Sequence, residues 1–132
     1  MAHRFGLWAP VVLWMSAIFY VSSMSDAGPP PGVSDIAAHG AAYCLLCVLV
    51  LRALSGGLPA RIGWRTAVIG VAITVIYGVT DEFHQSFVAN RVAELRDLYA
   101  NAIGASAGAA ACWAWGIIAP RPALRGAPRH DV

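Results

Sequence analysis

The sequence predicts an all-α integral membrane protein, a bundle of four transmembrane helices with both termini in the cytoplasm. Of its 132 residues, 58% are hydrophobic and only 12% are charged, whereas a soluble domain carries about 25% charged residues. Four apolar stretches approach the roughly 20 residues that a helix needs to cross a bilayer. This composition argues against a soluble enzyme, a disordered chain and a nucleic-acid-binding domain.

The first two expected spans cover residues 5–23 and 35–54. The first has no charged residue, and Trp8 and Tyr20 lie near its ends, where aromatic side chains anchor a helix at the membrane interface. We expect this helix to be retained rather than cleaved as a secretory signal, because its apolar run is longer than a usual signal core. Glycines and prolines at residues 28–32 separate the two spans and predict an exposed turn.

The third and fourth expected spans cover residues 64–87 and 98–118. A second cluster of helix-breaking residues, 55–59, precedes the third span. Asp81 and Glu82 enter the third span before its apolar run is long enough to cross a bilayer. We therefore expect this helix to continue past both acids with a polar face turned inward.

The distribution of arginines predicts the orientation in the membrane. With both termini inside, seven of the nine arginines lie on the cytoplasmic side, and only Arg91 and Arg96 lie outside, as the positive-inside rule favours. We interpret residues 1–119 as one transmembrane domain and residues 120–132 as a basic, disordered cytoplasmic tail. We expect the chain to cross the membrane several times.

Polar residues mark the outward end of the bundle. The second, third and fourth spans each carry two polar residues one helical turn apart at that end. Because an ionised group facing lipid costs about 2.5–3.5 kcal/mol or more, we expect these groups to face one another in an outward pocket. The side chains that we expect to bind a ligand there are Asp35, His39, Asp81, Glu82, His84, Gln85, Arg91, Asp97 and Asn101.

Two glycines predict where helices approach closely. Gly104 and Gly108 lie one turn apart in the fourth span, on the face that continues from Asp97 and Asn101. Such a pair of small residues lets the backbone of another helix come near. We therefore expect these glycines to serve helix packing.

The polar residues also form a recognisable pattern. Residues 80–87 read Thr-Asp-Glu-Phe-His-Gln-Ser-Phe, and an arginine, an aspartate, an asparagine and two glycines follow at set intervals up to residue 108. This order resembles the VanZ-like family, and Asp35, His39 and Tyr43 resemble the other motif of that family. The resemblance implies a polytopic membrane fold in the inner (plasma) membrane of a bacterium. It also implies an association with resistance to glycopeptides such as teicoplanin, by a mechanism that is unsettled. It implies no defined chemistry, and we do not extend the resistance to this chain.

Two positions depart from the family pattern. The chain has Ala89-Asn90 where the family often has Pro-Gly, and Ile36 where it often has lysine. These departures concern the shape of a loop and the local charge.

Three functions remain open at this point. The first is recognition of a lipid headgroup, or of a cell-envelope or glycopeptide-type ligand, in the outward pocket. The second is a membrane-embedded hydrolase or transferase that acts on a lipid-linked substrate through His39, His84 or Asp81, with a histidine as general base or as a metal ligand beside the acids. The third is a small proton-coupled transporter that works as a dimer.

The first function is the one we favour. The histidines do not follow a known metal-ligand spacing, and no serine lies in a nucleophile motif, so we assign no enzymatic activity, no metal and no cofactor. The expected partners are membrane lipids, a lipid-linked envelope precursor or a glycopeptide, and a second copy of the chain. We expect no nucleic-acid partner, because the arginines of the tail are scattered among prolines without a folded binding module.

Overall fold

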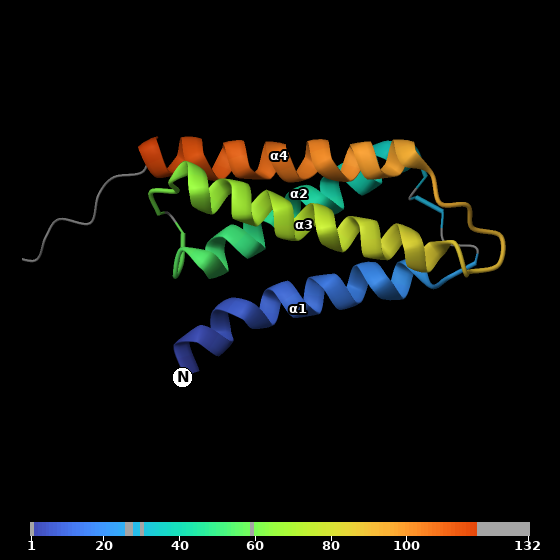
Figure 1. Cartoon of the computed structure of the whole chain (residues 1–132), viewed down its shortest axis with the longest axis horizontal. Helices are drawn as coiled ribbons and strands as arrows, with labels where there is room; N and C mark the ends of the chain where they lie inside the picture. The colour runs from blue at the N-terminus through green and yellow to red at the C-terminus, as the bar shows by residue number, and fades with distance from the viewer. Residues whose placement is uncertain (1, 26–27, 30, 59, 119–132) are drawn as a thin grey trace, which may run out of the picture.

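The structure is a computed structural model that describes residues 2–25, 28–29, 31–58 and 60–118, and four α-helices make up most of it (Figure 1). No strand occurs within these ranges. The prediction of an all-α chain with four helices is therefore confirmed. The expected tail, residues 120–132, lies outside the described residues. The helices are α1 (Ala2–Ser22), α2 (Asp35–Leu54), α3 (Trp64–Gln85) and α4 (Leu95–Ile118).

The helix boundaries follow the expected ones closely. Helix α2 coincides with the second expected span, and Ser34 caps its first turn by accepting a hydrogen bond of 3.2 Å from the Ala37 N–H. Helix α3 ends two residues before the expected boundary, because the Phe87 and Val88 N–H groups turn back to bond carbonyls three residues earlier. The loop that follows therefore begins at Ser86 and ends before Leu95.

The helices have the length and surface of membrane spans. Helices α1, α2 and α3 are each long and apolar enough to cross a bilayer. Helix α4 has 24 residues, but its many alanines and glycines are less apolar than leucine or valine, so a fourth span stays a prediction. Large apolar side chains such as Leu13, Ile76 and Ile103 are exposed on the bundle, a surface that is costly in water and suited to lipid.

The helix ends and loops fall at two opposite ends of the bundle. The N-terminus of α1, the loop between α2 and α3, and the C-terminal end of α4 lie at one end of the bundle (Figure 1). The loops from α1 to α2 and from α3 to α4 lie at the opposite end. The first end carries the described arginines Arg4, Arg52, Arg61 and Arg65. Which end faces the cytoplasm stays a prediction.

Helices α2 and α4 run in the same direction and make the most extensive helix contact of the bundle (Figure 1). Gly104 of α4 lies against the backbone of α2, where a Cβ atom would overlap the Gly40 carbonyl group. A Cβ at Gly108 would lie 2.6 Å from the Cys44 carbonyl oxygen. These two glycines therefore lie where one helix backbone meets the other.

Helix α1 is held more loosely than the others. It packs mainly on α2 and only slightly on α3, and it has no contact with α4 within the described residues. Two hydrogen bonds fix its middle, from Trp14 Nε1 to the Ala42 carbonyl at 2.9 Å and from the Tyr77 hydroxyl to the Met15 carbonyl at 2.6 Å. The C-terminal half of α1 thereby forms one wall of a cavity.

Candidate functional site

A cavity of about 320 Å³ lies between α1, α2 and α3 at the end where the loop to α2 begins. Its wall on α1 is apolar from Trp14 through Ile18 to Val21 and then becomes polar at Ser22. Ser22 comes eight positions after Trp14, so the wall from Trp14 to Ser22 is roughly 12 Å long. The polar side chains around the other end of the cavity are Ser22, Asp35, His39, Tyr43, Asp81, Gln85 and Arg91.

Asp81 ties three helices together beneath this cavity. Its side chain is 3% exposed, and its Oδ2 accepts hydrogen bonds from the Ser22 hydroxyl at 2.8 Å, the Gln85 amide at 3.2 Å and the Tyr43 hydroxyl at 3.3 Å. These donors come from α1, α3 and α2. The second carboxyl oxygen, Oδ1, is buried without a hydrogen-bond partner. Asp81 therefore fixes the end of α1 against the rest of the bundle and leaves one acceptor free.

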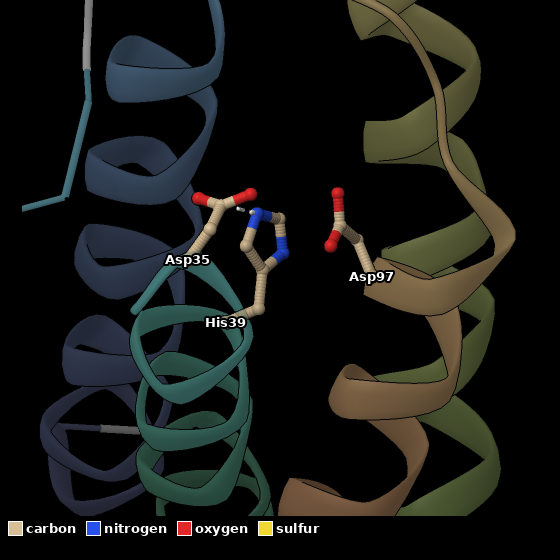
Figure 2. A group of neighbouring side chains, drawn as sticks. All are labelled: Asp35, His39 and Asp97. Carbon is tan, nitrogen blue, oxygen red and sulfur yellow. Dashed lines mark ion pairs between the residues drawn. The ribbon is translucent and has the colours of Figure 1, made fainter. Parts of the chain in front are cut away.

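His39 is the centre of a second group, which joins α2 to α4. Its Nδ1 lies 3.2 Å from Asn101 Oδ1, and its Nε2 lies 3.9 Å from Asp35 Oδ1. Asp97 points toward the same imidazole from the other side (Figure 2). The donor atoms of Asp35, His39 and Asp97 lie within 4.8 Å of one another.

Arg91 reaches the cavity from the loop between α3 and α4. Its Nε donates to the Met24 carbonyl at 3.1 Å, and one Nη donates to the Val21 carbonyl at 3.4 Å. The guanidinium group thus covers carbonyls at the C-terminal end of α1, where a cation is favourable. The preceding residue, Asn90, has φ 62°. Asparagine tolerates this left-handed conformation better than most residues, so it fills a position that suits the glycine often present in the family pattern.

Two of the predicted site residues point away from the cavity. Glu82 is buried and accepts a hydrogen bond of 3.3 Å from the Glu94 N–H, which fixes the loop before α4. His84 stacks on the Phe19 ring, with ring centroids 4.3 Å apart. Neither residue lines the cavity. Helical geometry explains this, because the residues beside Asp81 and Gln85 in the sequence lie on other faces of α3.

The nine predicted residues thus divide into three sets. Asp97 and Asn101 meet His39 without lining the cavity, and Glu82 and His84 lie outside both groups. The five that line the cavity are Asp35, His39, Asp81, Gln85 and Arg91.

Sequence reasoning missed the contribution of α1. Ser22 donates to Asp81, and Trp14 and Ile18 form the apolar wall, yet none of the three was a predicted site residue. A serine at the polar end of an apolar helix is the one available signal. It does not reveal which helix the serine faces.

Ser23 lies beside His84, and a serine next to a histidine can act as a nucleophile with its base. The Ser23 hydroxyl lies 3.1 Å from His84 Nε2, but it also lies 2.7 Å from the Phe19 carbonyl oxygen. A carbonyl oxygen only accepts, so the hydroxyl proton points to Phe19 and the imidazole donates to the serine oxygen. This is the reverse of the arrangement that activates a nucleophile.

The comparison with known proteins bears on the whole helical part of the chain. A family model described as VanZ/LLP1 matches residues 7–118, which include all of α2, α3 and α4 and most of α1. The comparisons with curated proteins and with solved structures gave no match. The expected resemblance is confirmed over much more than half of the sequence, and the chain is a membrane protein that belongs to the VanZ/LLP1 family.

Proposed function

We propose that this protein recognises a phosphate-bearing lipid headgroup, of a phospholipid or of a lipid-linked cell-envelope precursor, in the cavity beside α1. The observation that carries the proposal is the change of the cavity wall from apolar at Trp14 to polar at Ser22 and Arg91. A lipid likewise changes along its length from an apolar tail to a polar headgroup. The volume of about 320 Å³ lies at the lower end of the roughly 300–1,000 Å³ of small-molecule sites.

Arg91 is the proposed contact for the phosphate. A guanidinium group carries five N–H donors in a planar fork, and two of those donors are engaged by backbone carbonyls of residues 21 and 24. The remaining donors are available to an anion at the cavity. Because the backbone bonds hold the group in place, little conformational entropy is lost when a ligand binds.

The opposite side of the polar end suits hydroxyl or amine groups of the ligand. Asp35 and Asp81 both line the cavity, and each carboxylate presents acceptor oxygens. The free Oδ1 of Asp81 is a buried acceptor without a partner, and such atoms are rare in folded proteins. A headgroup donor at this atom would satisfy it.

The proposed location is the outer leaflet of a bacterial inner membrane. The described arginines at the far end of the bundle support a cytoplasmic position for that end. The cavity then opens toward the outer surface, where lipid-linked envelope precursors and glycopeptides occur.

Native mass spectrometry with defined lipids tests the proposal. We expect the purified chain to retain a phospholipid or a polyprenyl phosphate, and Arg91→Gln to weaken that binding by about tenfold or more, since a hydrogen bond to a charged group contributes about 1.5–3 kcal/mol. Arg65→Gln is the matched control, because Arg65 lies at the opposite end of the bundle. Equal binding by all three proteins would refute the proposal.

The same preparation separates the two alternative functions. Release of phosphate or transfer of the headgroup from a bound lipid would indicate the hydrolase or transferase. Flux into proteoliposomes that depends on a pH gradient would indicate the transporter. Against a serine nucleophile, the Ser23 hydroxyl points away from the base that it would need.

A further inference from the structure

The group around His39 has a geometry that the proposed lipid site does not explain. Asp35 and His39 lie one turn apart at the start of α2, and Asp97 faces them from the first turn of α4 (Figure 2). The imidazole lies between the two carboxylates. One nitrogen donor and two oxygen donors, within 4.8 Å of one another, thus converge from two helices that glycines hold close together.

The nitrogen and oxygen atoms of this group do not form hydrogen bonds with one another. Asp97 is 5% exposed, and its buried Oδ1 accepts no hydrogen bond. Arg96 Nε is 3.6 Å from that oxygen, which is beyond hydrogen-bond distance. The 3.9 Å between His39 Nε2 and Asp35 Oδ1 is also too long for a hydrogen bond. Neither distance is a hydrogen bond, so Asp97 Oδ1 and His39 Nε2 remain available to a further ligand.

Asn101 orients the imidazole. Its Oδ1 is an acceptor, so the 3.2 Å contact places the ring proton on His39 Nδ1. The other ring nitrogen, Nε2, then faces Asp35 Oδ1 at 3.9 Å with no hydrogen bond between them. A hydrogen bond on one ring nitrogen that directs the other toward a metal ion is a common feature of histidine ligands.

We infer that Asp35, His39 and Asp97 bind a divalent metal ion. Imidazole and carboxylate together suit Zn²⁺ or Mn²⁺. Two ligands of a tetrahedral ion lie about 3.4 Å apart, from bonds of about 2.1 Å, so donor atoms that are as much as 4.8 Å apart must close by roughly an ångström or more when the ion binds. Asp35 and His39 also line the cavity, which leaves the remaining coordination positions to water or to a ligand there.

The inference does not rest on the proposed function. The ion is measured by itself in lipid-free detergent, so a chain that binds a lipid without metal, or metal without lipid, would separate the two proposals. If both hold, the ion would provide a second positive contact for the phosphate, besides Arg91.

Isothermal titration of the full-length protein with Zn²⁺, and electron paramagnetic resonance with Mn²⁺, test the inference. We expect one tight site per chain, and we expect Asp97→Asn and His39→Gln to weaken it by more than about tenfold, since losing even an outer partner of a metal ligand costs about 10–100-fold in affinity. His84→Gln is the matched control, because this histidine belongs to α3 and stacks on Phe19 of α1, apart from the three residues on α2 and α4, and it should keep the affinity of the wild type.

Each outcome decides the question. Absence of a tight site in the wild type, or equal affinity in the wild type and in the folded variants Asp97→Asn and His39→Gln, would overturn the inference. If a buried substitution prevents folding, as judged by circular dichroism, Asp35→Asn replaces it. The Asp35 side chain is 38% exposed, so this change is tolerated more readily, and unchanged affinity there would also count against the site.

Discussion

The contact between α2 and α4 can be tested by adding one methyl group. Gly104→Ala places a Cβ where it overlaps the carbonyl group of Gly40. The overlapping atoms belong to the backbone, so no side-chain rotation relieves the clash and the two helices must move apart. Overpacking of this kind costs about 1–3 kcal/mol. The replacement also gains about 0.5–1 kcal/mol, because alanine favours a helix more than glycine does.

Gly6→Ala in α1 is the control that separates the cost of overpacking from the gain in helix propensity. A Cβ at Gly6 meets nothing within 4 Å, so this variant has only the gain in helix propensity. The difference in the free energy of unfolding between the two variants therefore equals the cost of overpacking, about 1–3 kcal/mol. Reversible unfolding in mixed micelles, followed by circular dichroism, measures it. If Gly104→Ala were as stable as Gly6→Ala, the close contact of α2 and α4 would be refuted.

Substitutions at three further positions test the contacts of α1 and the turn before Arg91, each by the same unfolding measurement. Ser22→Ala removes the hydrogen bond of 2.8 Å to buried Asp81, and we expect a loss of about 1–3 kcal/mol; no change would mean that α1 is not fixed there. Tyr77→Phe removes the hydrogen bond to the Met15 carbonyl and should cost about 0.5–1.5 kcal/mol, whereas a stability equal to the wild type would contradict that contact. Asn90→Ala should destabilise by about 1 kcal/mol because of the φ of 62°, and Asn90→Gly should not; the reverse order would exclude the left-handed turn.

The helices were predictable because their signal is local. An uninterrupted apolar run of about 20 residues has few structures open to it, and clusters of glycine and proline mark the connections. The second expected span therefore agrees with α2 at both ends. Helix α4 begins three residues before the expected position, because the Asp97 N–H bonds the Glu94 carbonyl and the first turn forms among polar residues, which hydropathy does not detect.

The site was predictable in part, for a related reason. Residues one turn apart share a face whatever the helix packs against, so the pairing of His39 with Asp35 and of Gln85 with Asp81 follows from spacing alone. The rotation of one helix relative to the next cannot be inferred from spacing, because these helices are apolar on most faces and their amphipathic signal is weak. For that reason the contact of Ser22 with Asp81 could not be foreseen. That Glu82 and His84 face away from the cavity could have been inferred from the 100° between successive residues of a helix.

A photo-crosslinking residue at position 18 tests the central proposal most directly. Ile18 lines the cavity, whereas Leu13 is 70% exposed on the outer surface of α1 and does not line it. In native membranes, we predict that a benzoyl-phenylalanine at position 18 captures one class of phosphate-bearing lipid in excess, while the same residue at position 13 captures the bulk lipid mixture. Identical lipid distributions at the two positions would contradict a headgroup-selective cavity.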